Sequence, residues 1–152
     1  MNCSRREWCL GLTSRASLAA LTALVTTHAE AHAAATGALP SRAYRFEDLP
    51  AHTSAGNTFR PVLDGELHTG AYIELHESDL APGAMPHPAH HHLHEEMFLI
   101  REGSVEVTIA GKSSSLGPGS VAYVASNQEH GIRNAGTTDA QYFVLAFGKD
   151  EQ

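Results

Sequence analysis

The chain has 152 residues, and its 17 Asp and Glu outnumber its 10 Lys and Arg. The sequence contains no basic cluster, which argues against nucleic acid and anionic membranes as partners. Both cysteines, Cys3 and Cys9, lie near the N-terminus, so the remainder of the chain can form neither a disulfide nor a zinc–thiolate site.

Residues 1–33 have the pattern of a removable export signal. Charged residues come first, a mildly apolar run over 16–27 follows, and small residues in an A-x-A pattern end the segment at Ala31 or Ala33. The apolar run is shorter than the roughly 20 residues that cross a bilayer, so we expect no stable membrane span. The alternative to a signal is a disordered or amphipathic N-terminal arm.

The segment Ser-Arg-Arg-x-Trp-x-Leu at 4–10 resembles a twin-arginine signal. This resemblance implies bacterial export of an already folded protein, and we therefore expect a periplasmic location. Residues 34–152 are long enough for one domain and too short for two.

After the signal, the sequence predicts short strands separated by turn residues. Residues 34–59 are expected to form a linker with a first strand at 44–49 and a loop at 52–57, and residues 60–148 to form one domain. No amphipathic run of helical length follows the signal, which favours an all-β sandwich or barrel. The clearest expected strands are 71–76, 96–100, 104–110, 113–116, 121–124, 130–134 and 141–147, with Phe98, Ile100, Ile132, Phe143 and Phe147 in the core.

A histidine-rich run, which is followed by two acids, is the strongest functional signal in the sequence. Residues i and i+2 of a strand face the same way, so His90 and His92 can point inward together, and Glu96 can rejoin them on the next stretch. His130, on a later predicted strand, is a fourth candidate. Three neutral imidazoles and one carboxylate suit Fe, Mn, Ni, Cu or Zn, so we expect one divalent transition metal.

These residues carry a resemblance to the cupin superfamily. The first cupin motif reads Gly, about five residues, His-x-His, three or four residues, Glu, six residues, Gly, and this chain has Gly83, six residues, His90-x-His92, three residues, Glu96, six residues, Gly103. The second reads Gly, five residues, Pro-x-Gly, two residues, His, three residues, Asn, and this chain has Gly119, His130 and Asn134 at that spacing.

The resemblance implies a single cupin barrel, also called a double-stranded β-helix or jelly roll, with His90, His92, Glu96 and His130 as metal ligands. It also implies a homodimer that pairs through its sheets. The chain departs from the second motif at Ala125 and Asn127, which stand in place of Pro and Gly. Because Asn tolerates the left-handed backbone that Gly often supplies in turns, we expect the second change to be benign.

The remaining polar side chains are less specific signals. His87, His91 and His94 lie off the ligand register, and a tract of exposed imidazoles can bind metal without a built site. A pairing of His92 with His94 would put the acid at Phe98 or Leu99, so the sequence disfavours it. We expect surface positions for His52, His68 and His76 and solvated carboxylates at Glu95 and Glu102, and the spacing selects none of Tyr72, Tyr123 and Tyr142.

Three classes of function stay open. The first is a metal-dependent oxidoreductase, most plausibly a dioxygenase, that acts on a small oxygen-rich molecule and uses Glu96 both as a ligand and as a proton acceptor. The second is a metal-dependent isomerase, decarboxylase or hydrolase in which the metal acts as a Lewis acid. The third is a non-catalytic module that binds a small molecule, since a fold does not determine function.

The export signal can be tested by replacing Arg5 and Arg6 together with Lys. The replacement keeps the charge but removes the paired guanidinium groups, so we expect the processed chain to be largely lost from the periplasm. Cell fractionation and N-terminal sequencing would measure this, with cleavage expected near Ala31 or Ala33. Undiminished export of the double-Lys variant would indicate the general secretion route instead.

Overall fold

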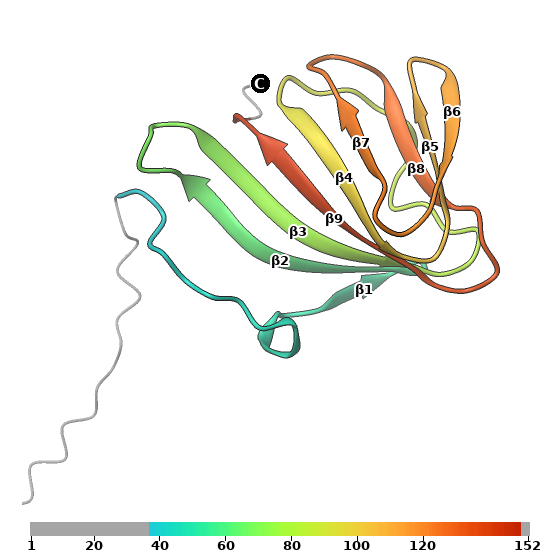
Figure 1. Ribbon diagram of the computed structural model, residues 1–152, viewed down its shortest axis with the longest axis horizontal. Coiled ribbons are helices and arrows are strands. Elements are labelled where there is room, and N and C mark those ends of the chain that lie inside the picture. The colour runs from blue at the N-terminus through green and yellow to red at the C-terminus, as the bar shows by residue number, and fades with distance from the viewer. Residues whose placement is uncertain (1–36, 150–152) are drawn as a thin grey trace, which may run out of the picture. The chain divides into compact units, whose positions relative to one another are not determined.

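The computed structural model describes residues 37–149, so the predicted signal and its cleavage sites lie outside the described residues. Two β-sheets face each other, one of six strands in the order β1-β2-β3-β9-β4-β7 and one of three in the order β6-β5-β8 (Figure 1). The strands are β1 (His52–Ser54), β2 (Asn57–Glu66), β3 (Tyr72–Leu80), β4 (Glu95–Glu102), β5 (Val105–Ile109), β6 (Lys112–Leu116), β7 (Val121–Val124), β8 (His130–Asn134) and β9 (Ala140–Phe147). All pairings between these strands are antiparallel, and the predicted all-β class and cupin jelly-roll architecture are confirmed.

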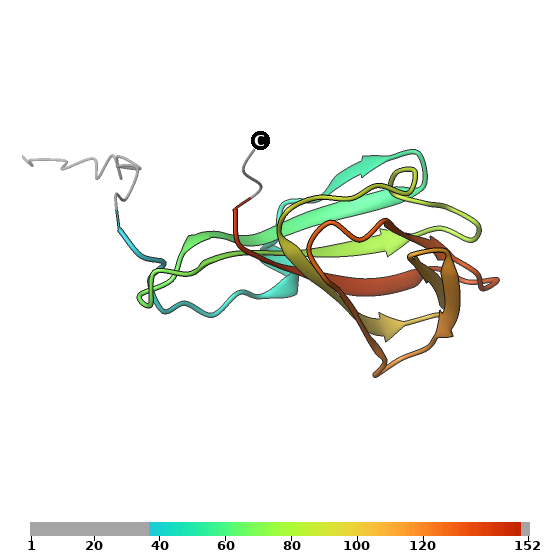
Figure 2. The ribbon, with the colours of Figure 1, turned by 90° about the horizontal axis from the view of Figure 1, so that it is seen from above.

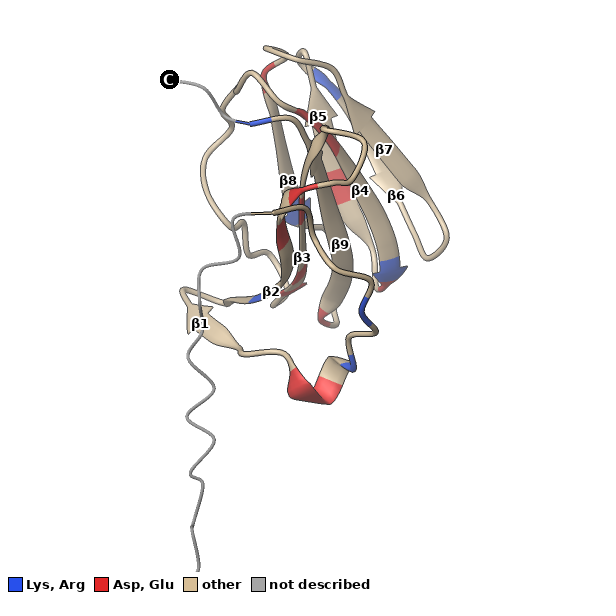
Figure 3. Cartoon of the chain, turned by 90° about the vertical axis from the view of Figure 1, so that its left-hand side faces the viewer, with Lys and Arg blue, Asp and Glu red and all other residues tan. Residues whose placement is uncertain are grey.

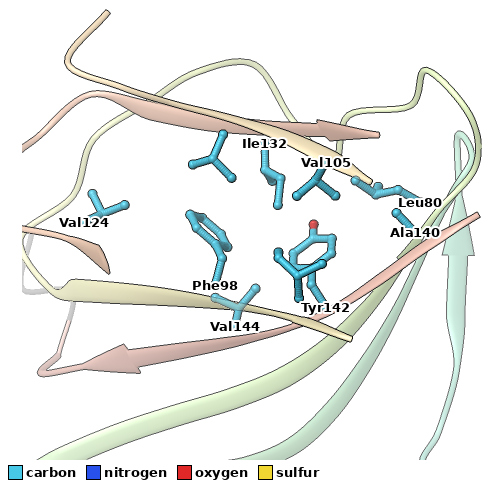
Figure 4. Close-up of a cluster of buried hydrophobic side chains, with 10 residues drawn as sticks. Leu80, Phe98, Val105, Val124, Ile132, Ala140, Tyr142 and Val144 are labelled. Carbon is cyan, nitrogen blue, oxygen red and sulfur yellow. The ribbon is translucent and has the colours of Figure 1, made fainter. Parts of the chain in front are cut away.

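The core lies where the two sheets overlap, because β2 and β3 project beyond the smaller sheet (Figures 1 and 2). Alternate side chains of β9 enter this core, including Tyr142 and Val144, and they meet Phe98 from β4 and Ile132 from β8 (Figure 4). The intervening side chains of β9 point to the outer face of the six-stranded sheet. The expectation that Phe143 and Phe147 are core residues is therefore wrong, and Phe147 is 37% exposed.

The N-terminal segment before β1 differs from the prediction. Residues 44–49 do not form a strand, and Phe46–Asp48 instead form the 3₁₀ turn η1. The ring of Phe46 lies between two guanidinium groups, 4.9 Å from that of Arg60 and 5.1 Å from that of Arg101. Cation–π contacts with these side chains, which come from β2 and β4, thus hold the segment on the sheet without strand pairing.

The expected loop at 52–57 also differs, because it contains strand β1. β1 pairs with the start of β2 across a tight turn at Ala55 and Gly56, whose φ angles are 48° and 79°. Two consecutive positive φ values are typical of the hairpin turn whose twist matches that of the strands. Alanine rarely adopts such a φ, and the sequence signal for this hairpin is correspondingly weak.

Strand β7 matches the bounds predicted for residues 121–124, but its side chains differ in burial. Val124 is fully buried, whereas Val121 and Tyr123 point outward and are 55% and 48% exposed. Lys and Arg are scattered singly over the described elements, while Asp and Glu include neighbouring positions on η1 (Figure 3). No helix within residues 37–149 is both long and apolar enough to cross a membrane.

Two glycines of similar backbone conformation provide a matched test of packing. Gly103 and Gly111 have φ angles of 76° and 77°. A Cβ at Gly103 would lie 2.6 Å from the Asp139 carbonyl oxygen and 2.7 Å from the Ala140 Cα, whereas a Cβ at Gly111 would meet nothing within 4 Å. The first close approach involves backbone atoms, which cannot easily move aside.

We therefore expect Gly103→Ala to destabilise the fold more than Gly111→Ala. Backbone strain should cost both variants about 1–2 kcal/mol, and crowding should cost Gly103→Ala roughly 1–3 kcal/mol more. Urea unfolding of the two variants and the parent measures the difference. Equal losses in the free energy of unfolding would contradict the close approach at Gly103.

Candidate metal centre

Backbone pairing brings the two histidine motifs together. His90 and His92 lie in the loop between β3 and β4, Glu96 lies in β4, and His130 begins β8. The His90 N–H donates to the His130 carbonyl at 3.0 Å, and the His130 N–H donates to the His90 carbonyl at 2.8 Å. The N–H of Asn127 donates to the His92 carbonyl at 2.8 Å, and its φ of 60° confirms that Asn supplies the left-handed conformation here.

The four predicted ligands form one compact cluster. The imidazole centroids of His90, His92 and His130 are 4.7 to 5.2 Å apart, and one ring nitrogen from each lies within 4.8 Å of the others. Oε2 of Glu96 lies 3.0 Å from Nε2 of His130 and 3.7 Å from Nε2 of His92. Each of these side chains is at least partly buried, and that of His130 is 1% exposed. The ligand assignment itself stays a prediction.

The hydrogen bonding of the imidazoles fits a bound divalent metal. Nδ1 of His92 donates to the His94 carbonyl and Nδ1 of His130 donates to the Gln128 carbonyl, both at 2.9 Å. These bonds fix the tautomer in which Nε2 carries the lone pair, as in metal-binding histidines. Nε2 of both residues and Nδ1 of His90 are buried without a hydrogen-bond partner among the described residues. Such orphaned nitrogens are rare, and a metal ion would satisfy them.

The charges in the cluster favour the metal-binding protonation states of His90 and Glu96 but not that of His130. Burial, together with the nearby imidazoles of His87 and His130, lowers the pKa of His90 to about 4. Burial acts to raise the pKa of Glu96, but the imidazoles beside it outweigh this and lower it. For His130 burial acts to lower the pKa, but the Glu96 carboxylate and the Gln128 carbonyl outweigh it and raise the pKa. Protons therefore compete with a metal mainly at His130.

Within residues 37–149, His94 is the one competing ligand. Its ring stacks on that of His92 at a centroid distance of 3.5 Å and an angle of 15°. His92, His94 and Glu96 also have ligand atoms within 4.8 Å of one another. His91, in contrast, is exposed and belongs to neither group.

A cavity of about 200 Å³ adjoins the cluster on the inner face of the six-stranded sheet. Glu96 and Phe98 contribute to its wall from β4. The lining also contains Asn57, Phe59, His76, Ser78, Pro86, His87, Ile132, Tyr142 and Val144. Of the three tyrosines that the sequence could not separate, the structure places Tyr142 in this cavity.

The surface position expected for His76 is wrong, since His76 lines the cavity and its side chain is 18% exposed. The apolar pair Ile73 and Leu75 lies on the opposite face of β3. Because the outer face of this sheet also carries apolar side chains, the alternation of apolar residues along β3 does not show which face lines the cavity. The alternating polar pair Glu74 and His76 was the signal that marked the inner face.

Three alanine variants test the ligand set. We expect His130→Ala to lower metal affinity at least tenfold, because it removes a buried ligand that joins the two motifs. His94→Ala and the exposed control His91→Ala should change the affinity little. Metal titration with calorimetric detection measures all three. Wild-type affinity in His130→Ala, with a loss in His94→Ala, would show that His92, His94 and Glu96 form the site instead.

Comparison with known proteins bears on the fold and on the family. Residues 76–146 match the family model of the cupin domain. A search of curated protein sequences gave no match.

The fold is shared with several solved structures. A cupin from Shewanella frigidimarina described as RmlC-like is 17% identical, with 74% of this chain and 95% of that chain covered and a TM-score of 0.62. The polyketide cyclase RemF from Streptomyces resistomycificus is 20% identical, with 75% and 83% covered and a TM-score of 0.61. A predicted oxalate decarboxylase from Thermotoga maritima is 20% identical, with 71% and 100% covered and a TM-score of 0.59. Residues 76–146 thus match the cupin domain model, and the solved structures show that the chain has the cupin fold.

Proposed function

We propose that this protein is a metal-dependent enzyme, an oxidoreductase of the dioxygenase type, that acts on a small oxygen-rich molecule. The observation that carries the proposal is the position of Glu96, which lies 3.0 Å from Nε2 of His130 in the cluster and also lines the adjoining cavity of about 200 Å³. A metal held by four protein ligands retains open coordination positions, and a cavity next to it gives a small molecule access to them.

A redox-active metal bound here would supply Lewis acidity and electron transfer. Glu96 would partly neutralise the charge of the ion and accept a proton from an incoming hydroxyl group. Phe98, Ile132 and Val144 exclude water from the cavity wall. Tyr142 stays protonated and available as a hydrogen-bond donor, because burial raises the pKa of its hydroxyl far above the usual range.

The size of the cavity narrows the class of substrate. Its volume of about 200 Å³ is below the 300 Å³ or so at which drug-sized sites begin. Enediols, catechols and small carboxylates are of the right size, whereas flavonols, with three ring systems, are too large. Small chelating molecules with two adjacent oxygen atoms therefore fit best.

A second candidate is Lewis-acid chemistry of the isomerase, decarboxylase or hydrolase kind. The presence of His76 and His87 on the cavity wall favours it, because imidazoles can move protons at neutral pH. A cyclase and a predicted oxalate decarboxylase share the fold, which shows that the fold is compatible with such names but assigns no activity to this chain.

We also propose that the protein acts as a homodimer outside the cytoplasm. Exposed apolar side chains on the outer face of the six-stranded sheet support the dimer, and they are Leu99, Val121, Tyr123 and Phe147. Export rests on the sequence pattern of residues 1–33 alone.

Elemental analysis followed by an oxygen-uptake assay tests the proposed function. We expect stoichiometric Fe, Mn or Cu, and oxygen uptake with at least one enediol, catechol or small carboxylate but none with flavonols. Glu96→Gln should lower turnover by at least tenfold more than it lowers metal affinity, because it removes the proton acceptor.

Other results would select a different class. Stoichiometric Zn would favour Lewis-acid chemistry. No oxygen uptake across the panel, together with tight binding of one compound, would identify a non-catalytic binding protein.

A further inference from the structure

We propose that Glu74 and His76 form a catalytic dyad that accepts a proton from the substrate, on the side of the cavity opposite the metal cluster. The proposal rests on the proposed function, since it requires a hydroxyl-bearing molecule bound at the metal. It assigns a role to two side chains that lie outside the ligand set.

The dyad has the geometry of an oriented base. Nδ1 of His76 lies 2.8 Å from Oε1 of Glu74, so the ring donates its Nδ1 proton to the carboxylate. Nε2 then carries the lone pair, and it has no partner among residues 37–149. The ring of Phe59 contacts the imidazole at a centroid distance of 4.6 Å and restricts its rotation. A carboxylate that holds one imidazole nitrogen and leaves the other available is the arrangement found in general bases.

The strand register places the dyad across from the cluster. Ala146 of β9 pairs with Glu74 on one side and with Glu96 on the other, and Val144 pairs in the same way with His76 and Phe98. Two strand spacings, about 10 Å, therefore separate the backbone of β3 from that of β4. Because the side chains between them are small, the space above β9 stays open, and His76 and Glu96 line the same cavity.

The other titratable groups of the cavity are less suited to this role. Tyr142 is held protonated by burial. His87 is exposed at the cavity, and its Nδ1 lies 3.0 Å from the carbonyl of Pro88 and not near a carboxylate. Glu96 belongs to the metal cluster. His76 is thus the cavity imidazole outside the cluster that has a carboxylate to stabilise its protonated form.

The proposed step is a proton transfer. The O–H bond of a substrate hydroxyl breaks, its electron pair stays on oxygen, and the proton forms a bond with Nε2 of His76. Glu74 balances the positive charge of the resulting imidazolium. A chelating molecule with two hydroxyl groups releases two protons, of which Glu96 can take one and the dyad the other. The step needs no oxidant or reductant.

A binding experiment with 4-nitrocatechol tests the dyad without turnover. The probe has two adjacent hydroxyl groups, and its absorption spectrum distinguishes the singly and doubly deprotonated forms. With the zinc-loaded full chain we expect the parent to bind the doubly deprotonated form at neutral pH. In His76→Gln the second deprotonation of the bound probe should move to higher pH by about one unit or more. Glu74→Gln should move it in the same direction by less.

The controls separate this proposal from the proposed function. His68→Gln, at an exposed position, should behave as the parent does. Zinc content should be unchanged in His76→Gln and Glu74→Gln, and its loss would overturn the dyad by showing that these residues hold the metal. Identical deprotonation of the bound probe in the parent and in both dyad variants would also overturn it, while leaving a metal site open to chelators. A parent protein that does not bind the probe would overturn the proposed function and the dyad with it.

Discussion

The site depends on the paired backbone of His90 and His130. The loop between β3 and β4 is not itself a strand, and this two-bond bridge joins it to the first residue of β8. Further along β8, Asn134 extends the attachment, because its carbonyl accepts from the N–H of Gly83 and its own N–H donates to the carbonyl of Ala84. The cluster of proposed ligands is therefore built on the interface between the two sheets, so binding of a metal there would be thermodynamically linked to folding.

The two faces of the six-stranded sheet use charge differently. On the inner face, Glu96 sits among imidazoles that lower its pKa. On the outer face, Glu77 is fully buried, and burial raises the pKa of its carboxyl despite the Arg60 guanidinium 2.6 Å away. Arg60 also contacts Asp79 and supports the ring of Phe46. On the outer face, Arg60 thus helps to hold the N-terminal segment through Phe46. On the inner face, Glu96 lies beside imidazole nitrogens that lack hydrogen-bond partners among the described residues.

Sequence patterns predicted the fold, and the four side chains that they proposed as ligands lie close together in the structure. The predictions that failed have identifiable physical reasons. The strands at 121–124 and 130–134 were predicted correctly because local features of the sequence, the turn residues and their spacing, determine their bounds. The cavity position of His76 was missed because both faces of β3 carry partly buried side chains, so the sequence pattern does not distinguish them. The turn at Phe46 depends on arginines from distant strands, and no local pattern reports such contacts.

The small inner side chains of β9 have a consequence for selectivity. Because the spacing of hydrogen-bonded strands is nearly constant, the sheet fixes the distance between the backbones of Glu96 and His76. Ala146 and Val144 of β9 lie between these two residues. The spacing of the strands then sets the length of a molecule that contacts both Glu96 and His76, while Val144, which lines the cavity between them, limits its thickness. On the proposed function, a single change at Val144 would alter specificity without replacing a proposed metal ligand or either residue of the proposed dyad.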